Sequence, residues 1–182
     1  MKSNLDIVPF SHHLIELYQD LEGIALDMTL GHGYDSIELT KHFKKVFAFD
    51  IQEEAINSAK ENLKDYHNIN IIKDNHLNYD NYVKDKIALA IYNLGYLPHG
   101  SKEITTNKDS TIASLRKLLV QLKINGIIIL VIYIGHPQGY QESKAINEFI
   151  KELALCQFKI IEYKILNREL APYILIIEKI KE

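Results

Sequence analysis

Short apolar runs alternate with amphipathic segments along most of this 182-residue chain. Seven apolar runs predict strands, at 24–28, 45–51, 69–74, 86–94, 126–134, 158–166 and 172–180. Five segments have apolar residues at helical spacing and predict helices, at 11–22, 35–43, 53–66, 111–123 and 144–155. Ser11 is the expected N-cap of the first of these helices.

The order of these elements predicts the fold class. Strand and helix alternate through the first five strands, which predicts a parallel sheet with helices on both faces. Only five residues separate the last two strands, too few for a crossover helix, so these strands should pair as an antiparallel hairpin. We therefore expect one α/β domain over 1–182, with an N-terminal helical segment at 1–22. Its mostly parallel, seven-stranded sheet is Rossmann-like, in the form that class I methyltransferases have.

Composition and charge restrict the functions that need considering. The net charge of −3 argues against a protein that holds long nucleic acid by charge alone, but allows a short RNA footprint. The lone Cys156 excludes an intramolecular disulfide, and we expect it to be a small buried residue. The apolar run at 126–135 is too short to span a bilayer, and the N-terminus has no signal-peptide core, so we expect a cytoplasmic protein. The histidines and this cysteine have no zinc-site spacing, and no metal is predicted.

A glycine turn follows the first strand. Gly31 and Gly33 allow close approach of the backbone to a ligand, and Ser36 stands where a dinucleotide motif would have its third glycine. Asp27 and Asp35 flank the turn and would repel a pyrophosphate. The same acids favour a ligand with an ammonium group and no phosphate, which points to S-adenosylmethionine.

Acidic residues at the ends of the next two strands extend the predicted cofactor site. Asp50 ends the second strand, where an acid accepts hydrogen bonds from ribose hydroxyls. Asp74 ends the third, where methyltransferases commonly place a polar residue against the adenine amino group; an ordinary strand-end cluster is equally compatible. His76 faces either ligand or solvent.

Three segments carry a family resemblance: "DMTLGHGYD" (27–35), "NLGYLPHGSKEITT" (93–106) and "YIGHPQG" (133–139). Together they resemble a small bacterial methyltransferase family, the MnmM (YtqB-like) group, which was first labelled as rRNA methylases. The resemblance covers almost the whole chain in order. The chain departs from the family pattern at Met28, Ser36, His99, Ser101 and Tyr140, and Ser101 replaces an acid.

The resemblance implies an activity and partners. The family methylates the exocyclic amine of 5-aminomethyl-(2-thio)uridine at the tRNA wobble position, with S-adenosylmethionine as methyl donor and the tRNA anticodon stem-loop as partner. A homodimer is compatible with it. Two alternatives remain: a methyltransferase acting on rRNA or on a small-molecule amine, and a non-catalytic protein that only binds S-adenosylmethionine.

The resemblance also adds site residues. Asn93 ends the fourth strand, where amine methyltransferases hold the target amine, and Tyr133 and His136 follow the fifth strand at the same sheet edge. We assign catalysis to these three residues, with Asn93 also beside the cofactor. The remaining cofactor-binding candidates are Thr29, Gln52 and Gly95, and the substrate-binding candidates are Tyr96, Pro98, Lys102, Lys108 and Arg116. His12 and His13 are assigned to a solvated helix face, with contact to RNA as the alternative.

Overall fold

The computed structural model describes residues 3–95 and 107–182. Its strands are β1 (Asp20–Asp27), β2 (Phe43–Asp50), β3 (Ile69–Lys73), β4 (Ile87–Leu94), β5 (Leu122–Ile132), β6 (Phe158–Lys164) and β7 (Tyr173–Lys179). Its helices are α1 (Ile7–Leu17), α2 (Tyr34–His42), α3 (Glu53–Asn62), the 3-10 helix η1 (His76–Asn81), α4 (Lys108–Gln121) and α5 (Pro137–Ile150).

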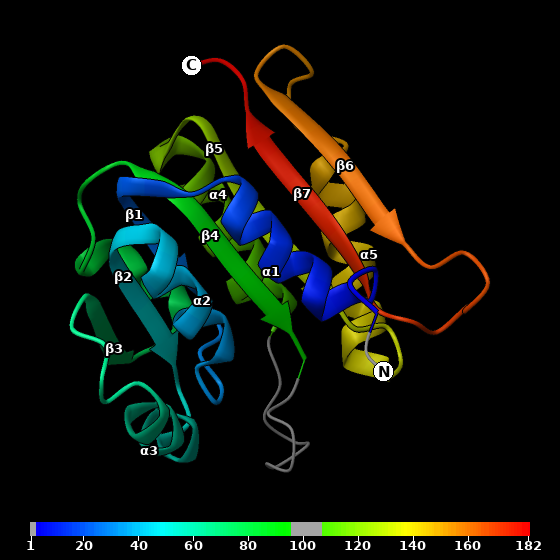
Figure 1. Ribbon diagram of the computed structural model, residues 1–182. Helices are drawn as coiled ribbons and strands as arrows, with labels where there is room; N and C mark the ends of the chain where they lie inside the picture. The colour runs from blue at the N-terminus through cyan, green and yellow to red at the C-terminus, as the bar shows by residue number, and fades with distance from the viewer. Residues whose placement is uncertain (1–2, 96–106) are drawn as a thin grey trace.

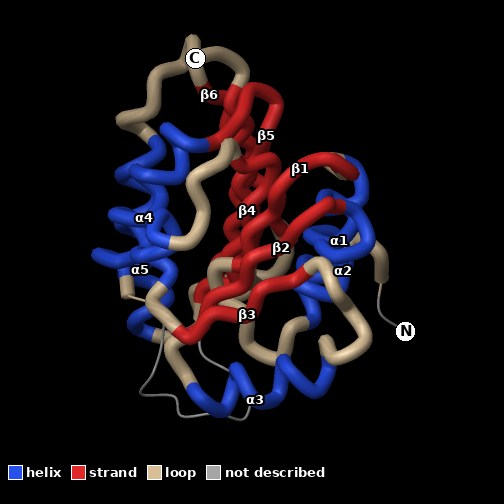
Figure 2. Tube along the Cα trace, turned by 90° about the vertical axis from the view of Figure 1, so that its left-hand side faces the viewer, coloured by secondary structure: helices blue, strands red, loops and turns tan. Residues whose placement is uncertain are grey.

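The seven strands form one sheet in the order β3-β2-β1-β4-β5-β7-β6 (Figure 1). The first five strands are parallel, and β7 runs antiparallel to both β5 and β6. The predicted mostly parallel sheet with a C-terminal hairpin is confirmed, and the structure adds that β7 lies between β5 and β6. Helices cover both faces, with α4 and α5 on one side and α1 and α2 on the other (Figure 2).

Alternation along the strands decides which side chains meet which helices. In β4, Leu89 and Ile91 pack in the same core as Leu14 and Ile15 of α1, whereas Tyr92 packs with α4 and α5. Successive side chains of a strand point to opposite faces. Asn93 therefore belongs to the face that α1 and α2 cover. In β1, Asp27 lies two residues after Ala25, which packs in the same core as α1, so Asp27 points to that face as well.

The predicted start of the first helix is wrong. The helix begins at Ile7, with Asp6 at its N-cap position, and Ser11 is a buried residue inside it. Ser11 is compatible with burial because its hydroxyl donates to the Val8 carbonyl oxygen at 2.8 Å. The helix ends at Leu17, and 20–22 already belong to β1, so the helical segment does not extend over 1–22.

Other boundaries move for local reasons. The helix α4 begins at Lys108, three residues early, because the Asn107 side chain caps it by accepting from the Asp109 amide at 2.8 Å. The helix α5 begins at Pro137, because His136 caps it. Cys156 is exposed beyond α5, and its predicted burial is wrong. Among the helices of the described residues, none is both long and apolar enough to cross a membrane.

Candidate active site at the ends of strands β1, β2, β4 and β5

Most of the predicted site residues meet at the carboxyl edge of the sheet. Asp27 and Asp50 end β1 and β2, Asn93 lies near the end of β4, and Tyr133 directly follows β5. The strands β1 and β4 are neighbours, but the chain leaves them toward opposite faces, with α2 after β1 and α4 after β4. This is the switch point at which open α/β sheets bind ligands.

The glycine turn and the end of β2 are joined by Asp50. Its carboxylate accepts from the Gly31 amide at 2.9 Å and from the Gln52 amide at 3.0 Å. Gly31 and Gly33 have φ angles of 51° and 84°, in the left-handed region that favours glycine. A Cβ at Gly33 would also lie 2.8 Å from the Leu63 side chain. The turn therefore needs both glycines and is held against the strand ends by Asp50.

Asp27 is fully buried beneath this turn. Its carboxylate accepts from the Ser36 hydroxyl at 2.6 Å and from the Thr29 amide at 3.1 Å. Burial, and after it the negative charges of Asp35 and Asp50, raise the pKa of Asp27 to about 7. Ser36, which the sequence placed at the missing third glycine, is thus a hydrogen-bond donor to the buried acid.

Replacing Asp27 with Asn is expected to stabilise the protein near and above neutral pH. The pKa of Asp27 rises from 3.8 to about 7 on folding, so its contribution to the free energy of unfolding becomes less favourable as pH rises between these values. The full shift corresponds to roughly 4 kcal/mol, and we expect the variant to recover about 1–3 kcal/mol of it at pH 8. Urea unfolding from pH 4 to 9 measures this difference. Asp80→Asn, at an exposed ion pair, is the control. Parallel pH curves for Asp27→Asn and wild type would contradict the shift.

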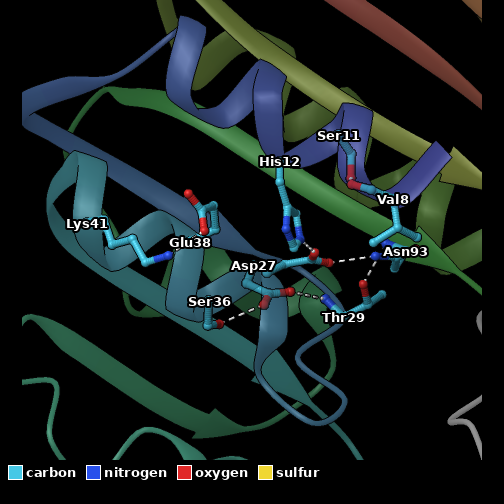
Figure 3. A network of polar contacts seen from close by, with 10 residues as sticks. Val8, Ser11, His12, Asp27, Thr29, Ser36, Glu38, Lys41 and Asn93 are labelled. Atoms are coloured by element: carbon cyan, nitrogen blue, oxygen red, sulfur yellow. Dashed lines mark hydrogen bonds and ion pairs between the residues drawn. The ribbon is translucent and has the colours of Figure 1, made fainter. Parts of the chain in front are cut away.

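Asn93 is held on two sides. Its backbone amide donates to the Thr29 hydroxyl at 2.7 Å, and its side-chain Nδ2 donates to Asp35 Oδ2 at 2.5 Å. The other carboxylate oxygen of Asp35 lies 2.7 Å from His12 Nε2 of α1 (Figure 3). Asn93 Oδ1 is buried and has no hydrogen-bond partner among the described residues. The site thus presents a fixed acceptor oxygen at the end of β4.

Tyr133 directly follows β5 and lies against Gly95, which follows the neighbouring strand β4. A Cβ at Gly95 would be 3.7 Å from the Tyr133 ring, so the ends of β4 and β5 are in close contact here. Burial, with a smaller effect of the Asp35 charge, raises the pKa of the Tyr133 phenol to about 12. The phenol therefore stays protonated at neutral pH and can donate a hydrogen bond, but cannot serve there as a phenolate base.

His136 has a structural part in this edge. Its Nδ1 accepts from the Gly139 amide at 3.1 Å and caps α5. A ring nitrogen that accepts a hydrogen bond is unprotonated, so a neutral His136 ring carries its proton on Nε2. Taking a proton at Nδ1 would cost this cap. The geometry thus favours positioning of α5 over the catalytic role that the sequence analysis assigned to His136.

Asp74 and His76 lie at the start of η1. Asp74 accepts from the Asn78 side chain at 2.8 Å and from the Tyr82 hydroxyl at 2.9 Å. These bonds, Asn78 first, lower the pKa of Asp74. His76 is 8% exposed and packs edge-on against Tyr92, which answers the question of solvent exposure. Burial lowers its pKa to about 4, so its ring is neutral.

Two of the predicted substrate-binding residues, Lys108 and Arg116, lie among the described residues. Tyr96, Pro98 and Lys102 lie outside the described residues. Lys108 is exposed at the start of α4. Arg116 pairs with Glu152 at 3.0 Å, and its guanidinium lies over the Phe149 ring, so it is directed toward α5. Within 3–95 and 107–182, no group of three or more His, Cys, Asp or Glu side chains could hold a metal ion.

His12 is the site residue that the sequence reasoning missed. Starting the helix at Ser11 hid the stripe formed by Ile7, Ser11, Leu14 and Ile15, which faces the core. With the helix begun at Ile7, His12 lies at the border of that stripe. A polar residue at the border of a buried stripe can reach the strand ends that the helix covers. The correct helix start would therefore have marked His12 as a candidate site residue.

Comparison with known proteins identifies the family. Residues 46–179 match the family described as "Putative rRNA methylase". The chain belongs to this family. The resemblance indicated by the three sequence motifs is therefore confirmed. A crystal structure from Clostridium thermocellum described as a "putative rRNA-methylase" is 32% identical, with a TM-score of 0.93 over 96% of this chain and 98% of that one.

A second solved relative bears on the cofactor. A protein from Streptococcus mutans described as a "putative methyltransferase" and solved in complex with SAH is 33% identical, with a TM-score of 0.89 over 99% of both chains. The prediction of S-adenosylmethionine agrees with that complex, because SAH is the product that this cofactor leaves after methyl transfer.

Curated relatives include RNA methyltransferases. The chloroplastic tRNA (mnm(5)s(2)U34)-methyltransferase of Arabidopsis thaliana is 31% identical over 171 residues, which is 85% of this chain and 62% of the relative. Ribosomal RNA small subunit methyltransferase H of Clostridium botulinum strain Okra is 32% identical over 118 residues, 59% of this chain and 38% of the relative. The chain thus spans less than two thirds of both relatives.

Proposed function

We propose that this protein is an S-adenosylmethionine-dependent N-methyltransferase. Its substrate would be the aminomethyl group of 5-aminomethyl-(2-thio)uridine at the tRNA wobble position, and its product the 5-methylaminomethyl derivative. One observation carries the assignment to an amine: the buried Oδ1 of Asn93 has no partner among the described residues, and the bond from Nδ2 to Asp35 fixes its direction. A buried acceptor held in this way suits a bound group that brings its own donor, as an amine does with its N–H.

The residues at the strand ends fit the cofactor. Asp27 and Asp35 suit the ammonium of its methionine part, the left-handed glycines let the backbone come close, and Asp50 can accept from ribose hydroxyls while it holds the turn. When bound, S-adenosylmethionine supplies the methyl group from its sulfonium. The protein then has to place and prepare the acceptor amine.

The chain's own residues provide that preparation. Asn93 Oδ1 accepts one N–H of the neutral amine, which leaves the nitrogen lone pair free to point at the methyl carbon. The Tyr133 phenol is protonated at neutral pH, so it can donate a hydrogen bond to a substrate bound at the ends of β4 and β5. An aminomethyl group that arrives as its ammonium would first lose a proton to water. With the cofactor bound, its sulfonium would supply the methyl group, and the proton of the methylated ammonium would also go to water.

A second substrate class is favoured by the relatives themselves. The family name and the Clostridium botulinum relative both refer to ribosomal RNA. The coverage of that relative is lower than that of the chloroplastic tRNA enzyme, 59% against 85% of this chain. We therefore place tRNA first and rRNA second.

Loss of the protein is expected to remove the methyl group from the wobble nucleoside. In a deletion strain of the source organism, mass spectrometry of tRNA nucleosides should show 5-aminomethyl derivatives in place of 5-methylaminomethyl derivatives. Complementation with the wild-type gene should restore the methylated nucleoside, and an Asn93→Ala gene should not. Unchanged tRNA nucleosides together with a lost methyl group in rRNA would overturn the tRNA assignment in favour of rRNA.

A further inference from the structure

Asp35 connects two side chains from different elements. Each of its carboxylate oxygens has one partner: Oδ1 lies 2.7 Å from His12 Nε2, and Oδ2 accepts from Asn93 Nδ2 at 2.5 Å. Asp35 itself is 7% exposed, in the first turn of α2. His12, Asp35 and Asn93 thus form a hydrogen-bonded network that links α1, α2 and β4.

This network determines which way the Asn93 amide points. The Asn93 NH₂ group donates to Asp35 Oδ2, and this bond sets the orientation of the amide. Its Oδ1 is then directed elsewhere and is left buried without a partner among the described residues. Were Asp35 to turn away, either orientation of the amide would be allowed.

The helix α1 places His12 for this contact. It packs against α2, and the buried Ile7, Leu14 and Ile15 anchor it on the face of the sheet to which Asn93 belongs. Figure 3 shows His12 extending from α1 toward the strand ends, where Asn93 and Thr29 lie. The contact between His12 and Asp35 thus fixes the side chain of Asn93, although the three residues are far apart in sequence.

We propose that His12 is a positioning residue for the methyl acceptor: it holds Asp35, and through Asp35 it keeps Asn93 Oδ1 turned toward the target amine. This inference rests on the proposed function, because it assigns a purpose to the same acceptor oxygen. His12 acts here through Asp35 and makes no contact with the reacting atoms.

The charges around His12 support a contact that persists across neutral pH. The hydrogen bond to Asp35 raises the pKa of His12, and burial opposes this; Glu38 raises it further and Lys41 lowers it, both from α2. On α1 itself, His13 pairs with Glu16 at 3.6 Å. Nε2 carries a proton both in the imidazolium and in one neutral tautomer, so His12 can donate to Asp35 in either state.

Three variants of the full chain test the proposal. His12→Ala removes the donor, and His12→Gln keeps an amide NH₂ near the position of Nε2. His13→Ala is the matched control, since it changes the neighbouring, mostly exposed histidine on the same helix. We expect His12→Ala to lower kcat on hypomodified tRNA by about 10–100-fold, with S-adenosylmethionine affinity changed less than about threefold. His12→Gln should regain most of the rate.

Two further readouts separate positioning from other roles. The rate ratio of wild type to His12→Ala should stay constant from pH 6 to 9; a ratio that grows with pH would mean a general base and overturn the proposal. The second is NMR of ¹⁵N-asparagine-labelled protein, with the Asn93 side-chain signal identified by its loss in Asn93→Ser. The Asn93 side-chain NH₂ should exchange its hydrogens with water about tenfold faster in His12→Ala, because one charge-assisted hydrogen bond is lost. In His12→Gln the exchange rate should return to that of wild type.

The NMR readout needs no substrate, so the two proposals can fail separately. If wild type methylates no tRNA but the Asn93 signal still follows the His12 variants, the proposed function is wrong and the link from His12 to Asn93 stands. If tRNA is methylated and neither the rate nor the Asn93 signal changes in His12→Ala, the proposal for His12 is overturned. Equal losses in His12→Ala and His12→Gln would also overturn it.

Discussion

Replacing Asn93 with Ala is expected to lower kcat for methyl transfer by at least about 100-fold while S-adenosylmethionine affinity changes less than about threefold. The substitution removes the buried Oδ1 acceptor and the donor to Asp35, but leaves the backbone bond from Asn93 to Thr29 in place. A misplaced acceptor nitrogen loses rate steeply, because methyl transfer needs the lone pair, the carbon and the sulfur in line. Single-turnover rates on hypomodified tRNA measure the first quantity, and calorimetry measures the second.

A matched control for this variant is Asn70→Ala. Asn70 also lies in a parallel strand, but its side chain makes only a 3.4 Å contact with the Val46 carbonyl in β2. Its loss should leave the rate within about twofold of wild type, since isolated surface contacts contribute little. If Asn93→Ala instead weakens cofactor binding as much as it slows transfer, Asn93 belongs to the cofactor site and the amine assignment loses its main support.

Replacing Asp50 with Ala is expected to weaken S-adenosylmethionine binding by about 100-fold. The carboxylate holds the Gly31 and Gln52 amides and, in the proposed complex, accepts from ribose hydroxyls as well. Hydrogen bonds to a charged group contribute about 1.5–3 kcal/mol each, and 1.4 kcal/mol corresponds to tenfold in affinity. Loss of the turn anchor adds the cost of ordering Gly31 again on binding. Calorimetric titration of the full chain with the cofactor measures the effect.

Glu53→Ala provides the control, because this acid lies three residues along and pairs with Lys73 in solvent. The variant should bind the cofactor as wild type does. An Asp50→Ala protein with unchanged affinity would mean that the cofactor does not lie over the end of β2, and the reading of the glycine turn would have to be abandoned.

Much of the architecture could be predicted because its signals are local. The buried strands appear as apolar runs. The connection before the last strand is too short for a crossover, so the antiparallel hairpin follows from the length of that connection alone. The glycines of the turn are likewise local: both have positive φ, which few other residues adopt. Errors came at helix starts: with Asn107 and His136 as caps, α4 begins three residues and α5 seven residues before the predicted starts at 111 and 144.

The site divides in the same way. From the sequence alone came the strand-end residues Asp27, Asp50 and Asn93, because parallel strands bring their carboxyl ends to one edge. Only the tertiary structure decided what these side chains do there: that Ser36 donates to Asp27, and that Asp35 is shared between His12 and Asn93. Such contacts join residues far apart in sequence, and their geometry depends on how α1 and α2 pack over the sheet. No periodicity along the chain encodes that packing, so the direction of Asn93 Oδ1 could be known only once the helices were in place.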